Sequence, residues 1–162
     1  MRGIRLKFML ALYTHSTRVY ACVFKANKQA WGISKEDFLT FPEGSLGHGL
    51  GCFYQEKGFD VMPKLENHDV FHLITATGTH IQDEIAMQFL LLGNGKISLY
   101  LLAMLLIGGL LFPEYAGYYW RSFQKGKRMW AFHQLEFKDC LSYPLADLQR
   151  TFENKLQLHL IK

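Results

Sequence analysis

Two histidines and two carboxylates in the middle of the chain have the residue types and spacing of metal ligands. His68 and His72 stand four positions apart, so on a helix their rings emerge from one face, one turn apart. A helix offers two imidazoles to one metal ion at this spacing in His-Glu-x-x-His zinc enzymes. Asp69 is turned by about 100° around the same helix, so it reaches the ion from the edge of the site or orients a ligand imidazole.

Glu84 can join these residues only if the chain reverses direction after His72. In one unbroken helix Glu84 would lie about 18 Å beyond His72, far outside a metal–oxygen bond of about 2 Å. Gly78 can end a helix in a left-handed conformation, and Thr79 with Gln82 can form a capping box that starts another. The sequence therefore predicts a helical hairpin folded at Gly78. The predicted metal ligands are His68, Asp69, His72 and Glu84.

The ligand types restrict the metal. Two imidazoles with carboxylates suit Zn²⁺, and also Fe²⁺ or Mn²⁺, and we expect Zn²⁺. A single histidine on a helix is more often structural, and the helix dipole alone favours Asp83 and Glu84 in a first turn. The coincidence of both histidines, the adjacent aspartate and the later glutamate favours a metal site instead.

The elements that must position these residues are predicted to be helices. The chain has 162 residues, of which 49% are apolar and 15% aromatic, enough for one compact domain spanning residues 1–162. Apolar residues recur at helical spacing over residues 4–30, within an N-terminal segment of residues 1–38. Ser34 and Asp37 resemble a capping box, Pro113 is placed to start a helix, and an amphipathic helix follows Pro144. We expect an all-α fold.

A glycine-rich stretch, residues 41–53, precedes the histidines. It resembles a phosphate-binding loop, but no Gly-Lys-Ser/Thr follows and no apolar strand precedes it. A glycine-rich turn leading into a closely packed helix is the favoured interpretation.

Residues 97–112 are sixteen residues without a charge. A helix of that length spans about 24 Å, short of the ~30 Å hydrocarbon core of a bilayer, so a membrane-spanning helix is not predicted. A helix that is apolar on every side must nevertheless be covered by protein core, by a partner or by a bound lipid tail.

Charge and cysteine content limit the partners. The net charge is +4 without a run of Lys or Arg, so nucleic acid is not expected, whereas an anionic membrane surface is compatible. The three cysteines share no short spacing, which favours a reducing compartment.

The spacing His-Asp-x-x-His, eleven residues, Glu resembles the signature of the coenzyme Q biosynthesis protein 4 family. Phe41-Pro-Glu-Gly-Ser-Leu-Gly is similar to the family's Pro-x-Gly-Thr-x-Gly stretch upstream of the site. Gly126-Lys-Arg and Pro144-Leu-Ala-Asp-Leu-Gln-Arg resemble its C-terminal pattern. The resemblance covers roughly residues 40–155.

The resemblance implies an all-helical protein of ubiquinone biosynthesis that binds a polyprenyl lipid. His68, Asp69, His72 and Glu84 would be zinc ligands, and the apolar helices around residues 85–92 and 97–112 would form a lipid channel for the prenyl tail. The implied activity is metal-assisted, oxidative decarboxylation at C1 of a polyprenyl-hydroxybenzoate ring, a lyase reaction. We expect the substrate to contact Leu99, Leu102, Leu106 and Arg121.

The resemblance also implies a location and partners. We expect a bacterial-type member, peripheral to the inner face of the cell membrane, or on the matrix side of the mitochondrial inner membrane in a eukaryote. The expected partners are other quinone-biosynthesis enzymes and a second copy of the chain.

Two alternatives stay open. The first is a non-enzymatic prenyl-lipid scaffold whose metal only holds the hairpin together. The second is an HD-type phosphohydrolase, for which His48 and Asp139 would supply the additional ligands. The basic residues Arg121, Lys125 and Arg128 could hold an anionic head group or form a solvated face.

Overall fold

The chain folds entirely into helices and connecting segments in the part that the structure describes. The structure is a computed structural model and describes residues 3–9, 11, 29–153 and 155. Within these ranges no β-strand forms, and only an isolated bridge joins Ser45 to Pro144. The all-α prediction is confirmed. The helices are α2 (Lys35–Leu39), α3 (Leu46–Lys57), α4 (Glu66–Thr75), α5 (Ile81–Gly93), α6 (Leu99–Leu111), η1 (Pro113–Tyr115), α7 (Ala116–Arg128), η2 (Lys138–Cys140) and α8 (Leu145–Glu153).

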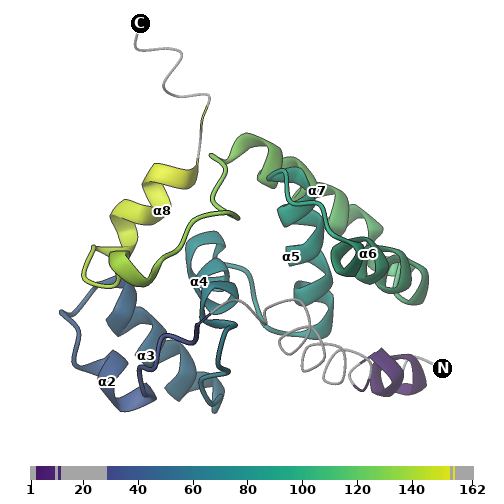
Figure 1. Ribbon diagram of the computed structural model, residues 1–162. Helices are drawn as coiled ribbons and strands as arrows, with labels where there is room; N and C mark the ends of the chain where they lie inside the picture. The colour runs from purple at the N-terminus through teal and green to yellow at the C-terminus, as the bar shows by residue number, and fades with distance from the viewer. Residues whose placement is uncertain (1–2, 10, 12–28, 154, 156–162) are drawn as a thin grey trace, which may run out of the picture.

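These helices form two neighbouring groups (Figure 1). In one group α3 packs against α2 and α4, and α8 packs against α4. In the other group α5 packs against both α6 and α7. Helices α4 and α5 follow one another in the chain and lie where the groups meet (Figure 1). Side chains of α4 and α5 can therefore converge on one site.

Local sequence signals account for several helix boundaries. The Ser34 side chain accepts a hydrogen bond from the Asp37 amide, and Asp37 accepts one from the Ser34 amide, which confirms the capping box at α2. Pro113 occupies the first turn of η1, which leads into α7. The helix predicted after Pro144 is α8, and Phe152 is its buried residue. The predicted helix over residues 4–30 is helical over residues 3–9, and most of its remainder lies outside the described residues.

The glycine-rich stretch is a turn that leads into α3, as predicted. The ring of Phe41 lies against Gly47, where an added Cβ would come within 2.5 Å of the ring. Ser45 caps α3 by accepting a hydrogen bond from the His48 amide. The close approach of Phe41 explains why a side chain is not tolerated at Gly47, and no phosphate loop is needed to explain the glycine.

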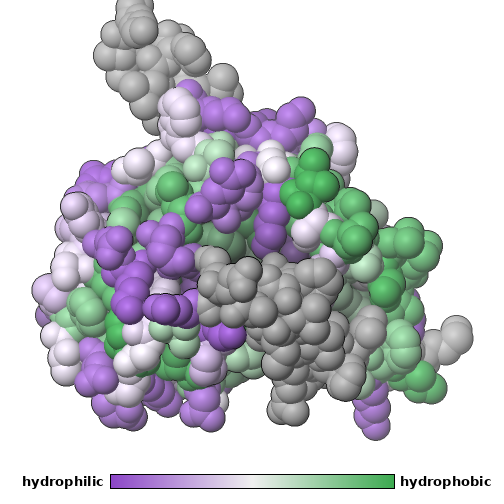
Figure 2. All heavy atoms as spheres, viewed as in Figure 1, coloured by the Kyte–Doolittle hydropathy of each residue, from purple (hydrophilic) through white to green (hydrophobic). Residues whose placement is uncertain are grey.

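Helix α6 is buried on one side only. Leu101, Met104 and Gly108 face the protein, whereas Leu99 is 80% and Leu106 65% exposed. Figure 2 shows hydrophobic residues, in green, gathered on the side of the molecule where α6 lies. We call the exposed residues the α6 outer face: Ile97, Leu99, Leu102, Leu106 and Leu110.

Within the described ranges, none of the helices alone has the length and apolar character needed to cross a bilayer. Only the bent pair Leu99–Leu111 and Pro113–Arg128, with 102° between its halves, satisfies both criteria when taken together.

Candidate metal centre

The turn between α4 and α5 differs in detail from the predicted hairpin. Helix α4 ends at Thr75, and Ala76 rather than Gly78 takes the left-handed conformation, with φ of 50°. Helix α5 starts after His80, whose amide donates to Asp83, so the predicted Thr79–Gln82 capping box is wrong. Gly78 lies within the turn, where a Cβ would come within 2.5 Å of the Asp83 carboxylate. The reversal is therefore present, but it begins two residues before Gly78.

This reversal brings three of the four predicted ligands together. His68 Nε2 lies 3.3 Å from Glu84 Oε2, His72 Nε2 lies 3.2 Å from Glu84 Oε1, and the two Nε2 atoms are 3.3 Å apart. Bonds of about 2.0–2.1 Å at a tetrahedral metal separate ligand atoms by roughly 3.3–3.4 Å. The three side chains could hold a metal ion, and each of these separations, two of which involve different Glu84 oxygens, is close to that value.

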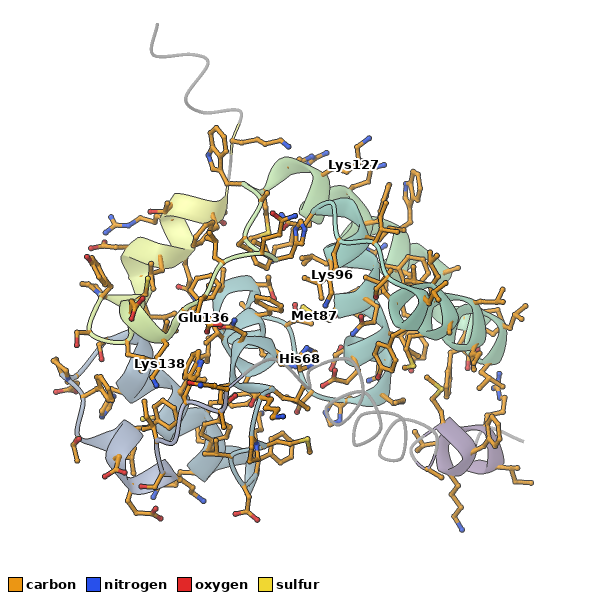
Figure 3. The ribbon with its side chains drawn as sticks, viewed as in Figure 1. His68, Met87, Lys96, Lys127, Glu136 and Lys138 are labelled. Atoms are coloured by element: carbon orange, nitrogen blue, oxygen red, sulfur yellow. The ribbon has the colours of Figure 1, made fainter. Side chains whose placement is uncertain are left out.

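The surroundings fix how His72 presents its ring. His72 Nδ1 lies 3.1 Å from the Thr77 carbonyl oxygen, which can only accept, so Nδ1 carries the proton. Nε2 is then the atom that faces Glu84 and His68: it donates to Glu84 when it is protonated, and when deprotonated it would offer its lone pair to a metal. The Phe53 ring stacks on the imidazole at a centroid distance of 5.8 Å and limits its rotation. His68 lies between α4 and α5 in the middle of the molecule (Figure 3).

The charges of the three groups are coupled. Burial favours the neutral acid of Glu84, but hydrogen bonds from His68 and His72 outweigh it and hold the pKa of Glu84 well below 4.5. Burial likewise disfavours the charged form of His72, but the hydrogen bond to Glu84, the negative charges of Glu84 and Asp69 and the Thr77 carbonyl together outweigh it and raise the pKa of His72 above 6.5. Without a cation the cluster therefore binds a proton on His72 more tightly than a free imidazole does, and a metal ion would displace that proton.

Asp69 is positioned by a residue outside the sequence motif. Tyr54 on α3 is buried, and its hydroxyl donates to Asp69 Oδ2 over 2.8 Å. Burial raises the pKa of Asp69, and the neighbouring His68 and the Tyr54 hydrogen bond counteract part of that rise. Asp69 lines the same pocket as the three clustered ligands but is not one of that group. Its role as a fourth ligand stays a prediction.

A pocket of about 530 Å³ opens in front of the cluster. This volume is in the range of small-molecule sites. Phe59 and Met62, from the segment between α3 and α4, are 42% and 40% exposed and form part of its lining. The other lining residues are Phe53, Tyr54, Gly58, Asp60, Leu65, His68, Asp69, His72, Thr79, Ile81 and Glu84. The pocket is thus mostly apolar and aromatic, and the clustered ligands and Asp69 are among its lining residues.

The other predicted site residues lie elsewhere. Leu99, Leu102 and Leu106 are on the α6 outer face, and none of them lines this pocket. Arg121 lines a second pocket, on α7. The structure does not bring these residues to the metal centre, and the predicted lipid channel and substrate contacts stay predictions.

His48 and Asp139, the additional ligands expected for an HD-type phosphohydrolase, do not line the metal pocket. His48 Nδ1 instead faces Cys52 Sγ at 3.7 Å. Asp139 is exposed on η2. The structure gives the phosphohydrolase alternative no support.

The residues that sequence reasoning missed are those that support the cluster from a distance. Tyr54 and Phe53 come from α3, and the Thr77 carbonyl comes from the turn. Neither aromatic residue has a spacing that links it to the histidines. Only the three-dimensional packing of α3 on α4 reveals them.

Comparisons with known proteins support the fold. No protein-family model matches the chain, and no curated protein matches its sequence. Among solved structures, the chain is similar to one from Nostoc punctiforme that is described as a candidate ubiquinone biosynthesis protein. The TM-score is 0.65 at 14% sequence identity, over 94% of this chain and 81% of the other. The two chains therefore share a fold.

Proposed function

We propose that this chain binds a divalent metal ion through His68, His72 and Glu84 and acts on a polyprenylated ring intermediate of quinone biosynthesis. The observation that carries the proposal is the cluster itself: the two imidazole Nε2 atoms lie 3.3 Å apart, and each lies 3.2–3.3 Å from one of the two Glu84 oxygens, close to the separation of ligand atoms around a tetrahedral metal. The motif resemblance and the shared fold with a protein described as a candidate for ubiquinone biosynthesis support the pathway.

We propose Zn²⁺ as the metal, with Fe²⁺ or Mn²⁺ as candidates. The bound ion would supply a Lewis acid for a carboxylate or phenolic oxygen of the ring. The ligands come from two helices, and the open pocket lies beside them, so a coordination position faces the substrate side. A catalytic metal site keeps such a position open.

The apolar residues of the pocket would bind the ring and exclude water. Phe53 and Leu65 are buried, and the more exposed Phe59 forms part of the lining. In this arrangement Asp69, held by Tyr54, is oriented to exchange a proton with a ring substituent. The proposed reaction breaks the bond between ring C1 and its carboxylate and releases CO₂; without oxidation, a proton takes the bonding pair at C1. Where a hydroxyl replaces the carboxylate, water supplies the hydroxyl oxygen and molecular oxygen takes up the two electrons and leaves as hydrogen peroxide, because Zn²⁺ has no redox chemistry.

The second candidate function is the prenyl-lipid scaffold. The α6 outer face favours it, because the described residues contain five exposed apolar side chains there that a lipid or an enzyme partner would cover. If Asp69 completed the coordination shell, the site would be closed and structural.

Mass spectrometry of a lipid extract from the purified protein, followed by a CO₂-release assay on a carboxyl-labelled hydroxy-polyprenylbenzoate, tests the proposal. We expect a prenylated ring acid to co-purify and CO₂ release to be lost in Glu84→Gln but kept in His48→Ala. A bound prenyl lipid without turnover would support the scaffold. A co-purifying nucleotide, with activity that depends on His48, would contradict both.

A further inference from the structure

A second pocket, lined by basic residues, lies on α7 and shares no lining residue with the metal pocket. It has a volume of about 550 Å³ and is lined by Trp120, Arg121, Gln124, Lys125, Arg128 and Glu153. We call it the α7 basic pocket. Arg121, Lys125 and Arg128 are at positions i, i+4 and i+7 of one helix, so their side chains emerge from one face.

The helix dipole explains only part of this charge. Lys125, Lys127 and Arg128 are in the last turn of α7, where cations interact favourably with the exposed carbonyls. Arg121 lies two turns before the end of the helix, beyond the reach of that effect. Its presence on the same face as Lys125 and Arg128 points to a ligand instead.

The hydrogen bonding of the three cations leaves donors available. Lys125 donates one hydrogen bond to the Thr75 carbonyl over 2.7 Å, which fixes its ammonium at the pocket while two N–H donors remain. Arg121 and Arg128 make no side-chain hydrogen bond or ion pair with any other residue that the structure describes. Two guanidinium groups are therefore free to bind an anion in a forked geometry.

The charge balance indicates which anion fits. Three cationic side chains and the Glu153 carboxylate give the lining a net charge of +2. A phosphomonoester carries about −1.5 to −2 charges at neutral pH and offers three acceptor oxygens. A carboxylate offers fewer acceptors and half the charge.

We propose that the α7 basic pocket binds a phosphate group, with Arg121 and Arg128 as its main ligands and Lys125 as a fixed third donor. The phosphate belongs either to a soluble phosphorylated molecule or to a lipid head group. The site differs from the metal centre in its residues, its helix and its ligand class.

Lys127 supplies a matched control. It carries the same charge on the same turn as Arg128, yet it does not line the pocket, and its ammonium lies 5.9 Å from the centre of the Phe123 ring. In Figure 3 the labelled Lys127 is on α7, well away from His68. A non-specific effect of surface charge would affect Lys127→Gln and a pocket variant alike.

Calorimetry with inorganic phosphate, at one fixed salt concentration, measures the affinity of the full chain. We expect saturable binding that weakens about 10-fold or more in R121Q/R128Q, and by less than about 2-fold in K127Q. Only the R121Q/R128Q variant loses charge-assisted hydrogen bonds to the phosphate. R121K/R128K keeps the positive charges but not the forked donor geometry of guanidinium, so its affinity for phosphate should lie between those of the wild type and R121Q/R128Q. E153Q should bind a few-fold more tightly, a gain that misfolding does not produce.

Sedimentation with vesicles of phosphatidylcholine, with and without phosphatidic acid, identifies the source of the phosphate. Saturable binding of inorganic phosphate that depends on Arg121 and Arg128 supports a soluble ligand. Binding only to vesicles with phosphatidic acid, with the same dependence, supports a lipid ligand. The proposal would be overturned if the protein bound neither inorganic phosphate nor vesicles with phosphatidic acid. It would also be overturned if R121Q/R128Q and K127Q weakened the binding equally.

Discussion

The metal centre and the α6 outer face present opposite combinations of chemistry and burial. At the metal centre, polar side chains are buried: His72 is 4% and Glu84 8% exposed. On the α6 outer face, apolar side chains are exposed, with Leu99 at 80%. Buried polar groups are stable only when they bond to one another, as His72 and Glu84 do, and this requirement fixes their geometry. The exposed leucines have no such requirement, and hydrogen bonding does not restrict their geometry.

The largest expected effect is the response of the metal centre to metal and pH. Without metal, the raised pKa of His72 gives a stabilisation that is complete below its unfolded value of 6.5 and is lost as pH rises through the folded pKa. Metal binding needs the neutral imidazole, so the stabilisation of the fold by bound metal grows as pH rises through the same interval. It reaches about 4 kcal/mol when the free metal concentration is 1,000 times Kd.

Thermal denaturation with added Zn²⁺ and with a chelator measures this difference. The gap in Tm should widen from about pH 6 to about pH 8 and disappear in His72→Ala. A gap that is independent of both pH and His72 would indicate that the metal binds elsewhere.

The second prediction compares a buried residue of α5 that packs against α6 with a residue of the α6 outer face. Ile85 is fully buried against Gly108, so Ile85→Ala should lower the free energy of unfolding by about 3 kcal/mol through the cavity left behind. Leu106 is 65% exposed, and Leu106→Ala should change the free energy of unfolding by less than about 0.5 kcal/mol. Urea denaturation measures both. A large loss in Leu106→Ala would show that a partner or second copy covers the α6 outer face in the purified protein.

The third prediction tests the support of Asp69. Tyr54→Phe removes the hydroxyl that donates to Asp69 while keeping the buried ring. Loss of a group that orients a metal-site residue typically costs 10–100-fold in affinity or activity, so we expect about a 10-fold loss of CO₂ release or Zn²⁺ affinity. Tyr118→Phe, which removes a hydroxyl bonded to Asp83 outside the metal pocket, is the control. Equal effects of the two variants would remove Asp69 from the mechanism.

The smallest expected effects separate two adjacent glycines of α6. A Cβ on Gly108 would come within 2.8 Å of the buried Ile85 side chain, whereas a Cβ on Gly109 meets nothing within 4 Å. Gly108→Ala should destabilise the fold by about 1 kcal/mol through overpacking, and Gly109→Ala should stabilise it by about 0.5–1 kcal/mol through helix propensity. Shifts of the same sign in Tm would contradict the assigned burial of α6.

The sequence was most informative where a chemical pattern is local. The capping box at Ser34, the glycine-rich turn before α3 and the start of η1 at Pro113 follow from single residues and their neighbours. The convergence of His68, His72 and Glu84 also followed, because a helical spacing and a required reversal restrict the geometry.

The errors arose where tertiary packing overrides local preference. An alanine at position 76 takes the left-handed conformation usual for glycine, so the helix ends two residues before Gly78, the residue that local preference favours. The charge-free segment of residues 97–112 did not reveal that one side would be exposed, because it has apolar residues on every side. The bonds from Tyr54 to Asp69 and from Lys125 to Thr75 join residues 15 and 50 positions apart, for which no local pattern exists.

The most direct test of the central claim is the metal content of the purified chain, measured by mass spectrometry after loading with Zn²⁺ and gel filtration. The account predicts one ion per chain in the wild type and in His80→Ala, whose histidine lies in the same turn outside the cluster. It predicts almost none in His72→Ala and Glu84→Gln. A wild-type protein without bound metal, or full retention in both variants, would contradict it.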